Sequence, residues 1–357
     1  MNNKNTLLLT SLLNLTLLAP LIQAHTIEET IADCKCDQSC YTDEVTDLVC
    51  KGSSFSFKSN SLPDESHTLM LGITGSNQQF PTKHNMEIKL PLNPKHASRI
   101  TQTEPGAVGI AVNGVPIFDP STQGPKQSSG KPVSAAKAGE LDECGGHAGR
   151  GDDYHYHIAP KCLIEELGKT AIDEKKQPVG YAADGFPILA LGWFDKGNDI
   201  ENKLDECRGA TDGSGQYFYN IENQGDYAIL DCLKGKEQRF ARDQWVHRKN
   251  SKGKEIQGMP IKFKVTHYQQ SEIAGNACYV MTGILSDEQL VKSNGRVKKV
   301  RQLEGSLFYC SASCYGQFIE TKSAKARGRT SVFDNQLKGC DANFSAIKNN
   351  GFLDFTN

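Results

Sequence analysis

Cysteine is the residue type that most constrains the fold of this chain. Twelve cysteines are spread along 357 residues, the first of them Cys34. An even number of cysteines in an exported chain favours disulfide bonds, which hold a fold together from within. The closely spaced sets, Cys34-x-Cys36-x3-Cys40 and Cys310-x3-Cys314, would suit thiolate metal ligation in a cytosolic protein. The choice between these interpretations therefore depends on whether the chain is exported.

The first 24 residues have the organisation of a secretory signal peptide. Lys4 supplies the positive charge of a short polar start, residues 7–19 form an apolar stretch, and Ala24 ends a small-residue cleavage site. The apolar stretch is shorter than the roughly 20 residues that span a bilayer. We therefore expect a secreted or periplasmic protein with oxidised cysteines. No later segment is long and apolar enough for a transmembrane helix, so no membrane insertion is expected.

The charge balance narrows the classes of partner. Lys and Arg number 40 and Asp and Glu number 42, so a field strong enough to recruit nucleic acid is not expected. The sequence points to no protein partner. It also lacks a Gly-x-Ser-x-Gly elbow, a Gly-x4-Gly-Lys-Ser/Thr phosphate loop and a His-Glu-x-x-His motif. Hydrolytic or nucleotide chemistry through those motifs is therefore unsupported.

Apolar periodicity and turn residues predict a mainly β (β-rich α+β) fold with short helices and several disulfides. After the signal peptide (residues 1–24), residues 25–60 hold four cysteines and few long apolar runs. This pattern indicates a small Cys-rich N-terminal module held by disulfides. Residues 61–235 form the principal domain. The more charged residues 236–357 are expected to be a β-rich C-terminal extension.

Several segments have patterns specific enough to predict a local structure. A hairpin is expected at Asn113-Gly114, within residues 107–118. A short helix is expected over residues 162–168, ending at Gly168. Residues 122–131 are expected to be a loop, and residues 308–322 could be helix or strand. Further strands are expected over residues 67–73, 86–92, 179–191, 261–267 and 277–285.

Two stretches of the principal domain align at a fixed offset of 63 residues without a gap. Leu141 to His147 and Tyr154 to Ile158 correspond to Leu204 to Ala210 and Tyr217 to Ile221, with Leu, Asp, Glu, Cys, Gly, both Tyr and Ile coinciding. Such a match indicates one structural unit used twice. Three of the four differences replace a histidine: His147 becomes Ala210, His155 becomes Phe218 and His157 becomes Asn220.

The joint loss of the three histidines predicts that they share one ligand. In an extended strand His155 and His157 project from the same face, about 6 to 7 Å apart. His147 lies on a glycine-rich loop that can fold back over them. Three neutral imidazoles suit zinc or copper and leave one coordination position open. The alternative is that all three are ordinary surface or hydrogen-bonded histidines.

Disulfides are expected to bracket both copies of the repeat. A bond from Cys144 to Cys162 would hold the histidine-bearing loop against its strand, and a bond from Cys207 to Cys232 would do the same in the second copy. The first copy is therefore interpreted as an occupied site and the second as its structural relic, which makes the repeat degenerate.

At these residues the chain resembles the YHYH protein family, named for the sequence found here at Tyr154 to His157. Further matching motifs are Asn113-Gly114-Val115-Pro116, Gly145-Gly146-His147, Gly180 to Ile188, and Leu204 to Cys207 with Cys232. The resemblance covers roughly residues 65–235. It implies an exported protein but no settled activity. Members often carry a second histidine-bearing tyrosine motif, which reads Tyr217-Phe218-Tyr219-Asn220 here, so the resemblance does not imply a second metal site.

Two further residues are weaker candidates for the metal. Asp184 stands in an apolar run and could be a fourth ligand, or a carboxylate that orients an imidazole; an ordinary Asp-Gly turn is the alternative. His25 would be the amino-terminal residue after cleavage, and could chelate copper through its amine and its ring.

Three functions remain open at this point. The first is an exported protein that binds one zinc or copper ion through His147, His155 and His157, for metal handling or structure. The second is a metalloenzyme that uses the open position of the same ion, hydrolytic with zinc or redox-active with copper. The third is a metal-free extracellular structural or adhesion protein.

Overall fold

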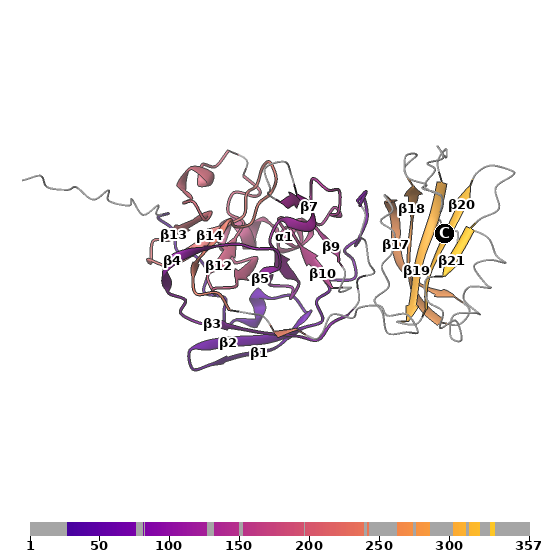
Figure 1. The fold of residues 1–357 in the computed structure, drawn as a ribbon. Helices are drawn as coiled ribbons and strands as arrows, with labels where there is room; N and C mark the ends of the chain where they lie inside the picture. Colours follow the sequence, from indigo (N-terminus) through magenta and orange to yellow (C-terminus); the bar gives the residue numbers. More distant parts are fainter. Residues whose placement is uncertain are drawn as a thin grey trace, which may run out of the picture.

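The fold is mainly β, and the described residues contain one short α-helix (Figure 1). A computed structural model describes residues 27–75, 81, 83–126, 132–149, 153–195, 197–238, 241–242, 263–273, 276–285, 303–311, 314–321 and 329–332. The predicted signal peptide and His25 lie outside these residues. No helix in the described part of the chain has the length and apolar character required to cross a membrane.

The core of the protein is an eight-stranded sheet. Its strands in spatial order are β13 (Gly209–Thr211), β14 (Tyr217–Asn220), β12 (Pro187–Leu189), β11 (Gly180–Ala182), β5 (Ala107–Ala111), β6 (Pro116–Phe118), β10 (Tyr154–Tyr156) and β9 (Gly146–Ala148). Most residues of these strands are buried. Short, fully buried strands explain the continuous apolar runs in this part of the sequence.

The two halves of this sheet have the same strand arrangement. The antiparallel pair β5–β11 lies in the middle of the strand order, and each half continues outward through a hairpin, a parallel neighbour and a second hairpin. Tyr156 pairs with Ile117 in one half, as Tyr219 pairs with Ile188 in the other. Figure 1 shows β13 and β14 at one end of this body and β9 and β10 at the other. The 63-residue offset therefore relates strands at opposite ends of one sheet.

The inner hairpins turn at the same dipeptide position in both halves. Asn113-Gly114 joins β5 to β6 and Asp184-Gly185 joins β11 to β12. Gly114 and Gly185 have φ angles of 73° and 88°, which side chains disfavour. A Cβ at Gly185 would also lie 2.5 Å from Pro91. The hairpin predicted at Asn113-Gly114 is confirmed, and residues 179–191 form a hairpin of two strands.

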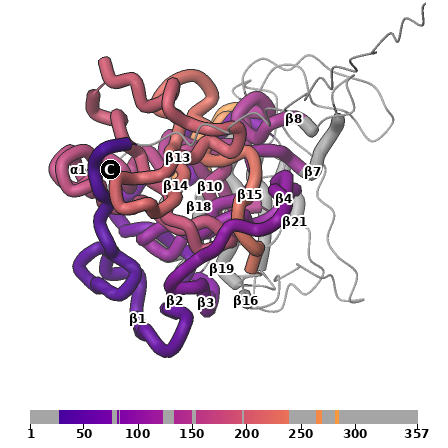
Figure 2. Tube along the Cα trace, turned by 90° about the vertical axis from the view of Figure 1, so that its left-hand side faces the viewer, coloured from indigo at the N-terminus to yellow at the C-terminus, as the bar shows by residue number. Residues whose placement is uncertain are grey.

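The N-terminal cysteines lie in a region that shares its sheet with the principal domain. Disulfides join Cys34 to Cys40 and Cys36 to Cys50. The adjoining elements are η1 (Gln38–Cys40), β1 (Val45–Lys51), β2 (Ser54–Ser59), β3 (Met86–Pro91) and β16 (Ala241–Arg242), the strands forming one four-stranded sheet. Phe55 of β2 packs into the main core, with its ring 5.0 Å from that of Tyr181. The expected Cys-rich module is thus joined to the principal domain by strand pairing and packing, as the view in Figure 2 also indicates.

Smaller elements surround the central sheet. They are β4 (His96–Gln102) paired with β15 (Cys232–Gly235), β7 (Ser121–Lys126) paired with β8 (Pro132–Ser134), α1 (Lys161–Lys169), the π-helical turn η2 (Thr170–Glu174) and η3 (Ile200–Lys203). Gly168 has a φ of 76° and interrupts the helix, as predicted, but the chain resumes helical geometry from Lys169. The Cys144–Cys162 disulfide fastens α1 to the loop before β9.

The C-terminal region contains a five-stranded antiparallel sheet in sequence order. Its strands are β17 (Phe263–Ile273), β18 (Asn276–Leu285), β19 (Leu303–Ser311), β20 (Cys314–Thr321) and β21 (Arg329–Val332). The described part of residues 308–322, left open between helix and strand, belongs to strands β19 and β20. Two backbone hydrogen bonds, from Gly72 to Val265 and from Val265 to Ile73, connect β17 to the principal domain.

Two local predictions were wrong. Residues 67–73 form turns instead of a strand, because Met70 and Gly72 take φ angles of 65° and 84°. The Met70 N–H is held by the carboxylate of Asp142, a contact that no local pattern encodes. Residues 121–126 form β7, whereas the Gly/Pro/Ser content of residues 122–131 predicted a loop. Pairing with β8 at Ser121 and Lys126 outweighs that composition.

An N-terminal strap, residues 27–31, closes the β13 edge of the sheet. The Ile27 N–H donates to Thr211 O at 2.9 Å, and the Ile31 N–H donates to Asp212 Oδ2 at 3.0 Å. Both isoleucine side chains pack into an apolar cluster with Phe218. The strap therefore joins the start of the described chain to the second half of the repeat.

The strap should contribute measurably to the stability of the domain. Ile31→Ala is expected to lower the free energy of unfolding by about 2 to 5 kcal/mol, because a buried side chain is removed from a packed cluster. Ile100→Ala is the matched control, since Ile100 is 43% exposed, and should change stability by less than about 0.5 kcal/mol. Urea unfolding of the two variants measures both values. Equal effects would show that the strap is not anchored by Ile31.

Candidate metal centre

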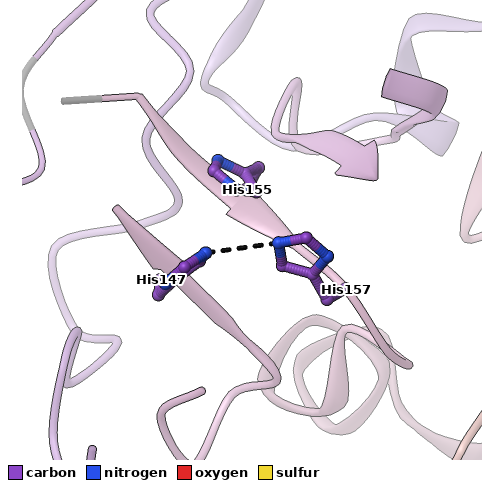
Figure 3. Close-up of side chains that lie close together, drawn as sticks. All are labelled: His147, His155 and His157. Carbon is purple, nitrogen blue, oxygen red and sulfur yellow. Dashed lines mark hydrogen bonds between the residues drawn. The ribbon is translucent and has the colours of Figure 1, made fainter. Parts of the chain in front are cut away.

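Three histidines converge at the β9–β10 hairpin. His147 on β9 lies directly opposite His155 on β10 in the strand register, and His157 follows one residue after the end of β10. Figure 3 shows the three rings on one side of the hairpin, facing one another. Their ring centroids are 4.8 Å (147–155), 5.1 Å (147–157) and 4.9 Å (155–157) apart. One nitrogen from each lies within 4.8 Å of the other two, and no carboxylate in the described part of the chain joins this group.

Backbone carbonyls fix the orientation of two of the rings. His155 Nδ1 lies 2.9 Å from Asp153 O, and His157 Nδ1 lies 2.5 Å from Asp119 O. A carbonyl oxygen can only accept, so in both rings Nδ1 carries the proton. In the neutral form, the lone pair of each ring is then on Nε2. Metal-binding histidines are commonly held in this way by a partner at the other nitrogen.

Burial keeps the imidazoles of His147 and His157 neutral. All three residues are buried, and desolvation, with a smaller contribution from His157, lowers the pKa of His147 well below its usual value. Burial also lowers the pKa of His157 to about 4, although the Asp119 carbonyl and the charge of Asp119 act in the opposite direction. Neutral imidazoles are the form that binds metal ions.

One carboxylate organises the loop that carries His147. Asp142 Oδ1 accepts from the N–H groups of Cys144 and Gly146, both at 3.0 Å, and its Oδ2 accepts from Tyr154 Oη at 2.8 Å. In the second copy Asp205 accepts in the same pattern from Cys207, Gly209 and Tyr217. This framework is therefore independent of the histidines, as the sequence contrast predicted.

Packing further restricts His155. The ring of Phe118 stacks on the imidazole with a centroid distance of 3.9 Å and an interplanar angle of 20°. On another side, a Cβ added to Gly149 would lie 3.2 Å from His155 Cε1. The imidazole is thus confined between an aromatic ring and the backbone, which limits its rotation.

The equivalent place in the second half is apolar. Ala210 and Phe218, which stand where His147 and His155 do, belong to a buried cluster together with Ile27 and Ile31 of the strap. Asn220, in place of His157, exchanges hydrogen bonds with the backbone of Leu191. The second half therefore keeps the strands but offers no group of metal ligands.

The remaining predicted residues lie as follows. Cys144 is bonded to Cys162, and Cys207 to Cys232, as expected. Asp184 is not part of the histidine group: its carboxylate accepts from Tyr219 Oη at 2.6 Å, Gly235 N–H at 2.8 Å and Phe186 N–H at 3.2 Å. Asp184 lies in the turn between β11 and β12, at the position that Asn113 takes between β5 and β6. The Asn113 amide donates to Tyr156 Oη at 3.0 Å, so both turn residues contact the second tyrosine of their half.

Two aspartates beside the histidines were missed by the sequence analysis. Asp119 and Asp153 are both buried, and each provides the carbonyl that accepts from an imidazole. A signal for Asp153 was present, since the residue at its position in the second copy is Gln216. Asp119 lies outside the aligned stretch and is brought to the site only by the pairing of β6 with β10.

The donor set fits a small transition-metal ion. With metal–nitrogen bonds of about 2.0–2.1 Å, two imidazole nitrogens of a tetrahedral zinc site lie about 3.3 Å apart. His147 Nε2 and His157 Nε2 are separated by 3.2 Å. Facing lone pairs on two buried neutral rings repel unless a cation or a shared proton lies between them. The buried Nδ1 of His147 has no hydrogen-bond partner, so no carbonyl fixes the orientation of this third ring.

The fold and the site define a disulfide-bonded β-sheet protein with a buried three-histidine cluster. The family model described as YHYH protein matches residues 87–199, which include the histidine-bearing hairpin. The chain thus contains a YHYH domain, in agreement with the resemblance seen in its motifs. No curated protein and no solved structure matches the chain.

Acid should destabilise the metal-free protein through these rings. Unfolded histidine takes up a proton below a pH of about 6.5, whereas His157 stays neutral to about 4 in the fold. Between these two pH values the unfolded state therefore binds more protons than the folded state. The contribution of His157 to the free energy of unfolding is fully present above pH 6.5 and is lost as the pH decreases toward 4. At pH 4.5 the loss from His157 should be about 2 to 3 kcal/mol.

Urea unfolding with a chelator at pH 7 and pH 4.5 measures this loss. The His157→Asn variant takes the residue found in the second copy and should lack this contribution. If the wild type and the variant had the same pH dependence, the buried-neutral state of His157 would be refuted.

Proposed function

We propose that this protein binds one transition-metal ion, zinc or copper, through His147, His155 and His157, for metal handling or for structure. The observation that carries the proposal is the convergence of three buried imidazoles, two of which have Nδ1 bonded to a carbonyl and Nε2 left to bind. Imidazole is the nitrogen ligand that zinc and copper favour.

The internal contrast supports a shared ligand for the three rings. The hairpins β9–β10 and β13–β14 have equivalent registers, with His147 opposite His155 where Ala210 lies opposite Phe218. A fold that can be built without the histidines does not require them for packing. We therefore interpret the second half as a former metal site in which apolar side chains have replaced two of the ligands.

The disulfides support a location outside the cytoplasm for the proposed metal site. The structure contains four disulfides in the described residues, a density typical of proteins that fold outside the cytoplasm. With the signal peptide predicted over residues 1–24, the protein would meet its metal in the periplasm or outside the cell.

Metal content provides the direct test of this function. Protein purified without an affinity tag is expected to carry about one equivalent of zinc or copper by mass spectrometry. The double variant His155→Ala/His157→Ala should carry none, because one imidazole cannot hold the ion, while the Cys144–Cys162 disulfide still forms. His96→Ala/His267→Ala is the control, since both rings are exposed, and should keep the metal. A metal-free wild type that cannot be loaded with either ion would refute the proposal.

A metalloenzyme is the second candidate, and one observation favours it. Only three protein ligands form the cluster within the described residues, and a three-ligand site leaves a position for an exogenous ligand. At such a position zinc can lower the pKa of bound water to about 7. In this chain, the buried carboxylates of Asp119 and Asp153 would be the nearby acidic groups.

An open position can be detected with cobalt as a spectroscopic substitute for zinc. Azide is expected to shift the visible absorption of the cobalt-loaded protein with a saturable dependence on its concentration. An unchanged spectrum at saturating azide would indicate a closed coordination sphere and would favour the structural role over catalysis.

A further inference from the structure

Two buried aspartates stand behind the histidine cluster. Asp119 and Asp153 are 5% and 3% exposed. The carbonyl of Asp153 accepts from His155 Nδ1 at 2.9 Å, and that of Asp119 accepts from His157 Nδ1 at 2.5 Å. The Asp153 carboxylate is also close to the ring it orients, with Oδ2 3.8 Å from His155 Nδ1. Each oriented imidazole therefore has a buried acidic residue as its partner.

The acidic residues are absent from the second half together with the histidines. Asp153 corresponds to Gln216 under the 63-residue offset. Asp119 corresponds to Ala190, because each lies two residues after the isoleucine that pairs with the second Tyr of the motif, Ile117 or Ile188. By contrast, the framework Asp142 is kept as Asp205. Negative charge is thus retained where it organises the loop and lost where the histidines are lost.

Charge explains why these residues would disappear together. Three neutral imidazoles add no charge of their own, so a divalent ion would place two positive charges in a buried site. Burying a charge without compensation costs several kcal/mol, and the penalty rises with the square of the charge. A monovalent ion such as copper(I) would need much less compensation. Two buried carboxylates balance a divalent ion.

We infer that Asp119 and Asp153 are the counter-charges that adapt the three-histidine site to a divalent cation, zinc(II) or copper(II). The inference rests on the proposed metal-binding function and adds the charge state of the ion to it. Both aspartates act on the ion through their negative charge, and neither binds the metal directly.

The turn contact of Asp119 and the two ring-orienting carbonyls do not themselves require a carboxylate. Asp119 Oδ1 accepts from the Ser121 N–H at 2.9 Å, a turn contact that an asparagine oxygen can replace. The two carbonyls that orient the rings belong to the backbone and need no acidic side chain. Both side chains also bring negative charge close to the rings.

The test separates charge from geometry with amide variants. Asp119→Asn and Asp153→Asn retain the carbonyls and an acceptor oxygen, but each removes one negative charge. The probes are zinc(II) and cobalt(II) as divalent ions and silver(I) as a monovalent ion that binds imidazole. Affinities are measured by competition with a chelating dye. Asp226→Asn makes the same chemical change at an exposed residue paired with Lys137 and serves as the control.

Each site variant is expected to weaken binding of divalent ions by about 10- to 100-fold. Binding of silver(I) should weaken by only about 3- to 10-fold, because the Coulomb energy is proportional to the charge of the ion. Asp226→Asn should leave both affinities unchanged. Circular dichroism and mapping of the Cys144–Cys162 bond establish that each variant is folded. Asp153→Gln, which introduces the residue of the second half, provides an independent variant at one of the two positions.

Unchanged affinities would overturn the inference, and so would equal losses for divalent and monovalent ions, which would indicate an effect on ring orientation alone. In both cases the wild type still binds metal, so the proposed function would stand. A wild type that binds none of these three ions and no copper would overturn the proposed function and this inference together.

Discussion

The structure depends on the antiparallel pairing of β5 with β11. Ile110 lies opposite Tyr181 in this pair, and the two four-stranded halves extend from it in opposite directions. Because side chains alternate between the faces of a strand, the register of each outer hairpin decides which residues meet. In one half that register brings three imidazoles together, and in the other it brings Ala210 and Phe218 into an apolar cluster.

Within this scaffold the histidine cluster is held by contacts that come from several segments. Asp142 orders the loop before β9, Asp119 arrives from the end of β6, and Phe118 stacks on His155. None of these partners is a candidate ligand. Their combined effect is to bury the three rings and to fix the orientation of two of them, so little conformational entropy is left to lose when a ligand binds.

The sequence predicted the parts of the fold that local patterns encode. The β class, the Asn113-Gly114 hairpin and the disulfides of the repeat follow from residue types and spacing, and so does the convergence of the histidines. Residues 67–73 could not be predicted, because their path is set by Asp142, about 70 positions away in the sequence. Asp119 was missed for the same reason: only strand pairing brings it to His157. The sequence left Asp184 open between a ligand and a turn residue, because its equivalence to Asn113 becomes evident only from the pairing of the two halves.

The position of the strap has a consequence for the order in which the chain can fold. Residues 27–31 are among the earliest to be synthesised, but Ile31 hydrogen-bonds to a side chain 181 positions later. Closing so long a loop is slow, since its entropy must be lost before any contact compensates for it. Until Asp212 is made, the β13 border of the sheet does not exist. The strap can therefore dock only after nearly the whole domain has been made, and it then covers this border against pairing with a neighbouring molecule.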